Sequence, residues 1–406
     1  MKYHTYTFPN GLRIIHLPTD NEVAHCGLFI NVGSRDELPH EKGIAHFVEH
    51  LMFKGTKKRK AFHILSRMDD SGGDINAYTS KEETCVHSSF LKNDYERSLE
   101  LMSDIVFHSV FPGKEINKEK EVIIDEINSY KDTPSELIFD DFEEMVFSEQ
   151  SLGSNILGDP KLLKKFTKAD IEQFVNRNYH PEKMVISSIG NISFQKLINI
   201  VDKYFGHALS GLTNEKREQI EAYQPKKLTV QKNTNQTHSI IGNISYGMHH
   251  SRRIPMALLE NIIAGPGMNN RLNMSLREKL GYVYHVESNY TAFSDIGLFS
   301  VYFATDPEKK EKSLEHIYKE FTKLRNQKLG KIQLSKAKKQ LFGQVAISSE
   351  NKASLMLSIG KSFLFTGKAD TLDEIHRKIE NVTSEDILFV ANEILNPEQL
   401  SILTYE

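Results

Sequence analysis

The chain has 406 residues, 26% of them charged, and a formal net charge of −3. This length is enough for two or three domains, and the small net charge without a basic tract excludes nucleic acid as an expected partner. No run of about 18 apolar residues occurs, so we expect no membrane span. The first residues lead directly into a strand pattern without a leader-like segment, which predicts a cytoplasmic protein.

Strand and helix patterns alternate along the first half of the chain. The strands are expected at residues 13–17, 25–32, 75–79, 84–91 and 184–189. The helices are expected at residues 43–53, 61–68, 99–106, 118–128, 135–147 and 194–204, with a further helix starting at the capping box of residues 167–170. Such a mixture predicts α+β layers. Cys26 and Cys85 lie in apolar alternating stretches without C-x-x-C spacing, which predicts two buried thiols.

The helix expected at residues 43–53 carries two histidines and a glutamate. His46 and His50 are four positions apart and share a helix face, which Glu49 borders. Two imidazoles at this spacing can bind one Zn²⁺, and the adjacent carboxylate can take a proton from a metal-activated water. The order H-x-x-E-H is the inverse of the common zinc-protease order H-E-x-x-H. An ordinary helix with two histidines on its polar face has the same spacing, so the motif alone does not show that this helix binds a metal.

A catalytic zinc site needs a third protein ligand and keeps one position open. The best candidate is Glu126, which follows His50 by 76 positions in the helix expected at residues 118–128. Glu119 lies two turns earlier on the same helix face. It can serve as a second catalytic carboxylate or orient a ligand, and an ordinary solvated glutamate is the competing interpretation.

These residues together resemble the metal signature of the inverted-motif zinc peptidases of the pitrilysin and mitochondrial-processing-peptidase type, family M16. Residues 43–45, 51–56, 72–79, 152–158 and 179–181 match that family as well, so the resemblance covers essentially the whole chain. It implies one Zn²⁺ held by His46, His50 and Glu126. Glu49 would then be the general base that later protonates the leaving amine.

The second half of the chain repeats the first at a slowly drifting offset. Residues 76–79 align with 288–291 at an offset of 212, residues 98–100 with 313–315 at 215, and residues 167–171 with 383–387 at 216. Two diverged copies of one domain produce this pattern, and the period is too long for a solenoid. We therefore predict domains at residues 1–209 and 228–406, joined by a polar linker at residues 210–227.

The repeat limits the number of metal sites. At an offset of 212, His46, Glu49 and His50 align with Leu258, Asn261 and Ile262. We therefore expect one zinc site per chain, in the N-terminal domain. The resemblance implies that the C-terminal domain closes over the first and encloses the substrate, and that two chains of two α+β domains form a clam-like chamber.

A second informative stretch spans residues 269–284. It resembles the C-terminal motif of the family, in which an arginine and a tyrosine seven residues apart reach the metal site. The matching residues are Arg277 and Tyr284. A cation and a phenol there would bind the substrate and stabilise the oxyanion that develops on its carbonyl group. Without the resemblance, a surface helix followed by a strand tyrosine explains the same residues.

The strand expected at residues 75–79 is a candidate for substrate binding. If Asn76, Ala77 and Tyr78 lie on an exposed sheet edge beside the metal, an extended peptide can add to them as a further strand. An ordinary internal strand has the same sequence pattern, so this alternative stays open.

The expected function is that of a zinc-dependent endopeptidase, which hydrolyses peptides or unfolded polypeptide segments inside an enclosed chamber. The chain carries both the metal motif and the pair Arg277 and Tyr284, so a homodimer with two sites is the simpler expectation. The alternative is a non-catalytic structural or partner subunit. Such subunits typically have degenerate metal motifs, and the intact motif here argues against that function.

Overall fold

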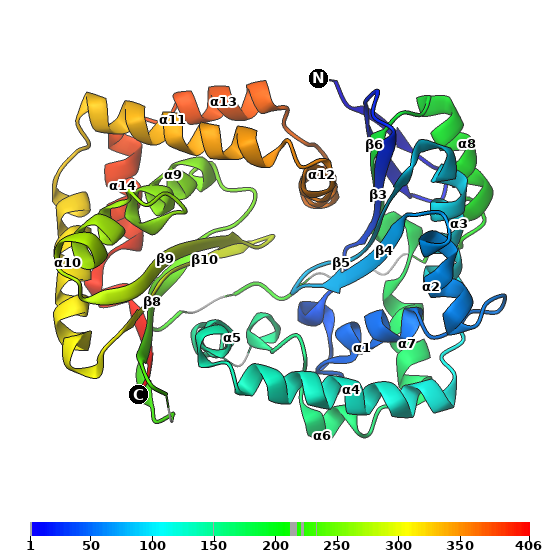
Figure 1. Ribbon diagram of the computed structural model, residues 1–406, viewed down its shortest axis with the longest axis horizontal. Helices are drawn as coiled ribbons and strands as arrows, with labels where there is room; N and C mark the ends of the chain where they lie inside the picture. Colours follow the sequence, from blue (N-terminus) through cyan, green and yellow to red (C-terminus); the bar gives the residue numbers. More distant parts are fainter. Residues whose placement is uncertain (1, 149, 212–216, 221–222, 233) are drawn as a thin grey trace. The chain divides into compact units, whose positions relative to one another are not determined.

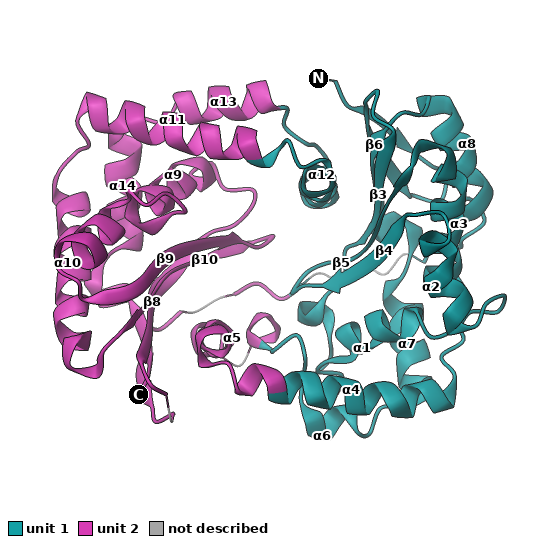
Figure 2. Cartoon of the chain, in the orientation of Figure 1, with its two compact units in different colours: residues 1–128, 154–217, 348–371 teal, residues 129–153, 218–347, 372–406 magenta. Residues whose placement is uncertain are grey.

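The computed structural model describes residues 2–148, 150–211, 217–220, 223–232 and 234–406 (Figure 1). The chain divides into two compact units (Figure 2). Unit 1 comprises residues 1–128, 154–217 and 348–371, and unit 2 comprises residues 129–153, 218–347 and 372–406. Each half of the sequence therefore contributes one segment to the unit built mainly from the other half, which a division at a linker does not anticipate. Of the linker predicted at residues 210–227, residues 212–216 and 221–222 lie outside the described part of the chain.

Unit 1 is built on a six-stranded mixed sheet in the order β1-β2-β6-β3-β5-β4. Its strands are β1 (His4–Thr7), β2 (Arg13–Pro18), β3 (Val23–Ile30), β4 (Asp74–Thr79), β5 (Thr84–Leu91) and β6 (Met184–Gly190). Among the described strands of this sheet, only β2 and β6 pair in parallel, and β6 is buried along its whole length. β4 is an edge strand, because β5 is its only strand partner among the described residues.

Helices cover both faces of this sheet. Those wholly or mainly in unit 1 are α1 (Ile44–Met52), α2 (Ala61–Asp69), α3 (Tyr95–Phe107), α4 (Gly113–Lys131), α6 (Pro160–Leu163), α7 (Lys168–Asn178), α8 (Phe194–Phe205) and α12 (Lys352–Thr366), with the 3₁₀ segments η1 (Ser34–Asp36), η2 (Lys92–Asp94) and η4 (Pro181–Lys183). Figure 1 shows α3 and α8 on one face and α12 on the other. On α12, Met356 and Phe363 join the apolar cluster around Phe29.

Unit 2 has a five-stranded mixed sheet in the order β7-β11-β8-β10-β9. Its strands are β7 (Lys227–Val230), β8 (Thr237–Tyr246), β9 (Val283–Ala292), β10 (Ile296–Thr305) and β11 (Ser401–Tyr405). Its helices are α5 (Pro134–Val146), α9 (Arg253–Ala264), α10 (Lys310–Asn326), α11 (Lys331–Ser348), α13 (Leu372–Glu380) and α14 (Ser384–Ile394), with the 3₁₀ segments η3 (Ser151–Gly153), η6 (Pro307–Lys309) and η7 (Pro397–Gln399) and the π-helical η5 (Asn273–Lys279). Although α5 comes from the first half of the chain, its Ile138 and Phe142 pack with Leu403 of β11.

The two sheets follow one plan. The parallel pair β7 and β11 corresponds to β2 and β6, and the edge strand β9 corresponds to the edge strand β4. Capping boxes start α7 at Thr167 and α14 at Thr383, the positions that the repeat aligns. The predicted α+β fold with two repeated domains is confirmed.

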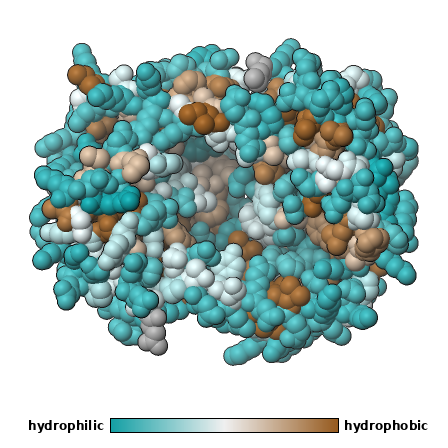
Figure 3. Space-filling model, in the orientation of Figure 1, coloured by the Kyte–Doolittle hydropathy of each residue, from teal (hydrophilic) through white to brown (hydrophobic). Residues whose placement is uncertain are grey.

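Polar side chains dominate the molecular face that Figure 3 shows, where hydrophobic residues form separate patches. Cys26 and Cys85 are both buried and free, as predicted. Among the helices that the structure describes, none combines the length and the apolar character needed to cross a bilayer.

Candidate metal centre

Helix α1 is held in place at its N-terminus by a distant carboxylate. Its N-cap is Gly43, which has a φ of 95° and no side chain to cap the helix. The side chain of Glu37 caps the helix instead. Its Oε2 accepts a hydrogen bond from the Gly43 N–H at 2.9 Å, and its Oε1 accepts one from the Ala45 N–H at 2.8 Å. Burial raises the pKa of Glu37 to about 8, and the two hydrogen bonds from the backbone oppose that rise. The start of the helix that carries His46 is therefore fixed by a residue outside the motif.

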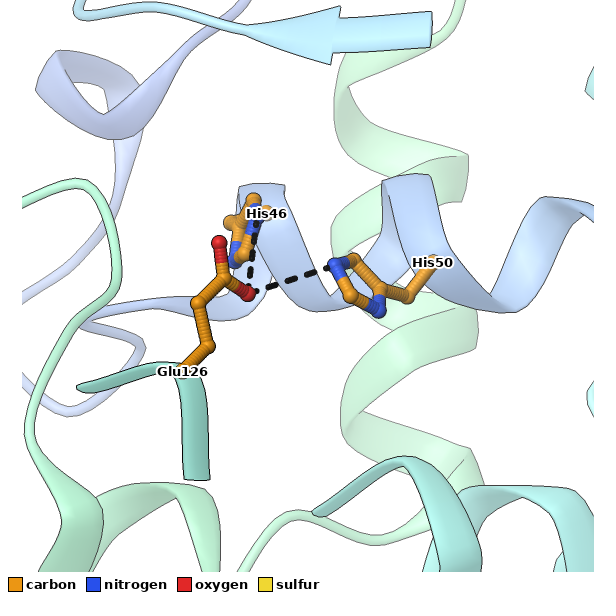
Figure 4. Close-up of side chains that lie close together, drawn as sticks. All are labelled: His46, His50 and Glu126. Atoms are coloured by element: carbon orange, nitrogen blue, oxygen red, sulfur yellow. Dashed lines mark ion pairs between the residues drawn. The ribbon is translucent and has the colours of Figure 1, made fainter. Parts of the chain in front are cut away.

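The structure brings His46, His50 and Glu126 together (Figure 4). Glu126 Oε2, from α4, lies 3.9 Å from His46 Nε2 and 3.7 Å from His50 Nε2. One potential ligand atom from each residue lies within 4.8 Å of the other two. In the part of the chain that the structure describes, this is the one group of three or more such residues with metal-binding geometry.

The chemistry of the three side chains fits a zinc ion. Burial, with a smaller contribution from the neighbouring His50, lowers the pKa of His46 to about 3. His46 is therefore neutral at pH 7, the form in which imidazole binds a metal. Two imidazole nitrogens and one carboxylate form the donor set of catalytic zinc sites, in which the fourth position takes water or substrate.

Glu119 lies behind His50 and is not part of the ligand group. Its side chain is 2% exposed, its Oε2 lies 3.2 Å from His50 Nδ1, and its Oε1 lies 2.9 Å from Lys54 Nζ. The interpretation as a solvated glutamate is therefore wrong. Sequence reasoning missed Lys54, although Lys54 follows His50 by four positions and so had a spacing signal.

Glu49 is positioned separately from the ligands. Its Oε2 accepts a hydrogen bond of 2.6 Å from the hydroxyl of Thr79, the last residue of β4. Burial raises the pKa of Glu49, and the hydrogen bond from Thr79 opposes that rise. A carboxylate that lies beside the candidate metal ligands and has a raised pKa suits a general base. Sequence reasoning did not identify Thr79, because the contact joins a helix to a strand and has no local spacing.

The strand that contains Asn76, Ala77 and Tyr78 is β4, the edge strand that packs beside α1. The alternative of an internal strand is therefore wrong. Asn76 is exposed, whereas the Tyr78 hydroxyl donates to Glu83 Oε1 at 3.2 Å. The side chain of Tyr78 is thus already engaged, and its backbone is what the edge offers to a peptide.

Arg277 and Tyr284 belong to unit 2, whereas the three candidate ligands belong to unit 1. Arg277 is exposed in η5, and Tyr284 in β9 is 56% exposed, with its hydroxyl donating to Asp306 Oδ1 at 2.7 Å. Their approach to the metal stays a prediction. On α9, which aligns with α1, Leu258 and Asn261 are buried.

Comparisons with known proteins identify relatives along most of the chain. Residues 14–160 match the family model described as Insulinase (Peptidase family M16), and residues 165–341 match the one described as Peptidase M16 inactive domain. The uncharacterised zinc protease YmxG of Bacillus subtilis is 34% identical over 97% of this chain and 96% of its own length.

Two solved structures share the fold. A protease from Helicobacter pylori superposes with a TM-score of 0.91 at 21% identity, covering 100% of this chain and 99% of the other. A Pseudomonas fluorescens protein described as a peptidase M16 inactive domain superposes with a TM-score of 0.93 at 19% identity, covering 100% and 98% of the two chains. At these identities, the structural similarity supports the fold and not the activity.

Proposed function

The chain belongs to peptidase family M16, and from this membership and its cluster of His46, His50 and Glu126 we propose that it is a zinc-dependent endopeptidase. The observation that carries the proposal is the convergence of two imidazole nitrogens and one carboxylate oxygen beside a separate carboxylate, that of Glu49. One zinc ion per chain would be held there. When bound, it would polarise the scissile carbonyl and lower the pKa of the attacking water.

Glu49 supplies the acid–base chemistry in this proposal. Its carboxylate removes a proton from the attacking water and afterwards delivers a proton to the leaving amine. The hydroxyl of Thr79 donates to Oε2 of Glu49, whereas Oε1 accepts no hydrogen bond from the described residues and is available for the proton. We assign no ligand role to Glu119 and infer that it orients His50.

The edge of β4 supplies the substrate site in this proposal. An extended peptide pairs with the backbone at Asn76, Ala77 and Tyr78, and main-chain hydrogen bonds give affinity with little sequence selectivity. Because Thr79 is the last residue of β4 and also contacts Glu49, the same strand links substrate binding to the base. The substrates are peptides or unfolded polypeptide segments.

The second unit contributes Arg277 and Tyr284 in this proposal. Both side chains are exposed in unit 2, which is what contact with a substrate requires. A guanidinium and a phenol would stabilise the negative charge that develops on the scissile carbonyl. The enclosed chamber, the homodimer and the cytoplasmic location stay predictions, and the mass of the native complex tests the homodimer directly.

A non-catalytic partner subunit is the second candidate function. Two observations support it. The family model that matches residues 165–341 is described as an inactive domain, and α9 lacks the histidines and the glutamate that α1 carries at the aligned positions. One preparation separates the two functions, if bound zinc and cleavage of a quenched peptide are measured on the same sample. Stoichiometric zinc with chelator-sensitive cleavage is expected of the peptidase. Zinc without any cleavage would favour the partner subunit.

A further inference from the structure

We propose that Lys54 is a positioning residue of the metal centre, which acts through Glu119 to hold His50 in the orientation that metal binding requires. The inference rests on the proposed zinc site. It concerns a residue outside the H-x-x-E-H motif, located just beyond the end of α1.

A chain of three contacts connects Lys54 to the metal position. Lys54 Nζ lies 2.9 Å from Glu119 Oε1, and Glu119 Oε2 lies 3.2 Å from His50 Nδ1. The other ring nitrogen of His50, Nε2, lies 3.7 Å from Glu126 Oε2. One carboxylate thus uses its two oxygens for two partners, and His50 presents its remaining nitrogen to the ligand group.

The location of Glu119 explains why it needs a cation. On α4 it occupies the buried face together with Ile116, Ile123 and Ile127, and its side chain is 2% exposed. A carboxylate in such a position is costly unless a charge compensates it. Lys54 meets this need, because its side chain is 27% exposed and its ammonium can stay partly hydrated while it binds Oε1.

The consequence for His50 follows from the geometry. When Glu119 accepts a hydrogen bond from Nδ1–H, the lone pair of the neutral ring is on Nε2, the nitrogen that faces Glu126. Without the ammonium of Lys54, Oε1 loses its cation and the carboxylate gains by turning toward water. His50 would then lose the contact that fixes its tautomer and ring orientation.

The test is a double-mutant cycle on zinc affinity, measured by competition with a chromogenic chelator. The variants are Lys54→Met, Glu119→Gln and the double variant, with Lys54→Arg as the charge-conserving variant and Lys58→Met as the matched control. Lys58 is exposed four positions further on. Lys54→Met is expected to weaken zinc binding by about 10-fold, as residues behind metal ligands commonly do. Lys54→Arg retains most of the affinity, and Lys58→Met retains all of it.

The cycle assigns the effect to Glu119. In the Glu119→Gln background, Lys54→Met is expected to add no further loss, because the two residues act in series. An equal loss in both backgrounds, or unchanged affinity in Lys54→Met, overturns the inference while leaving the zinc site intact. Failure of the unaltered protein to bind zinc overturns the proposed function instead.

A second readout does not depend on zinc or activity. Nitrogen-15 spectra of the histidine rings in the metal-free unaltered protein are expected to show His50 as the Nδ1–H tautomer. In metal-free Lys54→Met, His50 is expected to be a mixture of the two tautomers. If Lys54→Met does not fold, Lys54→Gln takes its place, since it also removes the charge. An unchanged His50 tautomer in a folded uncharged variant overturns the inference.

Discussion

At the scale of single residues, Glu49 and the proposed metal ligands differ in what they contact. The ligand atoms of His46, His50 and Glu126 face one another, whereas Glu49 accepts from Thr79 on the neighbouring strand. The spacing of His46, Glu49 and His50 follows from one helix and was predictable from sequence. Glu49 contacts Thr79, and Glu119 contacts Lys54. Both contacts depend on how separate elements pack; the spacing of Lys54 from His50 places Lys54 near the site but does not indicate Glu119 as its partner.

Substitution of the proposed base separates metal binding from catalysis. Glu49→Gln is expected to retain near-stoichiometric zinc, because Glu49 is not one of the three proposed ligands. Peptide hydrolysis is expected to fall by ~10²–10⁴, the range of a lost general base. Zinc content and cleavage rate are measured on one sample.

Thr79→Val is the companion variant, since valine has nearly the same shape and lacks the hydroxyl that holds Glu49. A smaller loss of turnover is expected, with Thr79→Ser restoring most of it. Full activity in zinc-loaded Glu49→Gln would show that another group is the base.

A second buried histidine, remote from the metal ligands in sequence, makes the stability of the fold depend on pH. His16 on β2 is fully buried, its Nδ1 lies 3.1 Å from Ser188 Oγ, and burial together with the nearby His4 lowers its pKa to about 4. The folded state therefore favours the neutral ring. Its contribution to stability is present above pH 6.5, the ordinary pKa, and is lost as the pH falls toward 4.

The expected loss at pH 4 is about 3 kcal/mol, at about 1.4 kcal/mol per pKa unit. Urea unfolding of the metal-free protein at several pH values measures it, with His16→Gln as the comparison. Glutamine does not titrate, so the variant should lose less stability than the unaltered protein between pH 6.5 and pH 4. Identical losses in both proteins would contradict the prediction.

At the scale of elements, capping boxes indicated where two helices start, whereas no local signal indicated which sheet a helix packs on. The capping boxes at Thr167 and Thr383 start helices α7 and α14 as their sequences indicate. Helices α5 and α12 form where apolar residues recur, but each packs on the sheet of the unit built mainly from the other half of the chain. An apolar helix face predicts that the face is buried, but it does not predict which sheet buries it.

Removal of the carboxylate at the start of α1 tests whether one element positions the whole site. Glu37→Ala leaves the N–H groups of Gly43 and Ala45 without their acceptor. The expected cost is about 2–6 kcal/mol of unfolding free energy, at about 1–3 kcal/mol for each of the two unsatisfied groups. Zinc affinity is expected to fall as well, because the orientation of His46 depends on the first turn of α1.

Chemical denaturation and chelator competition measure the two effects of Glu37→Ala. Glu22→Ala is the control, since Glu22 forms a surface ion pair with Lys92 and its side chain is 72% exposed. A Glu37→Ala protein as stable as the control would show that water replaces the carboxylate at this helix end.

At the scale of the whole molecule, the internal repeat predicted the architecture. It also predicted candidate metal ligands in one copy alone, and within the described residues the structure has one such cluster, in unit 1. The sheets of the two units match strand for strand except for β1, and helix α9 carries Leu258, Asn261 and Ile262 where α1 carries His46, Glu49 and His50. The candidate metal ligands on this helix therefore occur in one copy and are absent from the other. The exchange of α5 and α12 between the halves means that neither unit is formed by one continuous segment.

The purpose of the second unit is tested by the residues it is proposed to supply. Tyr284→Phe removes one hydroxyl from an exposed strand residue, so fold and zinc content are expected to stay unchanged. If the phenol stabilises the oxyanion, turnover of a short peptide falls by ~10²–10³, as for one lost preorganised donor. The measurement is steady-state cleavage with zinc determined on the same sample.

Arg277→Ala should in addition raise KM, because it removes a cation that binds the substrate. The matched control for Tyr284→Phe is Asp306→Asn, since Asp306 accepts the hydrogen bond from the Tyr284 hydroxyl. If that bond only anchors the side chain, both variants should have the same small effect, whereas an oxyanion donor predicts a large loss in Tyr284→Phe alone. Unchanged kcat in fully zinc-loaded Tyr284→Phe would mean that unit 2 takes no part in the chemistry through this residue.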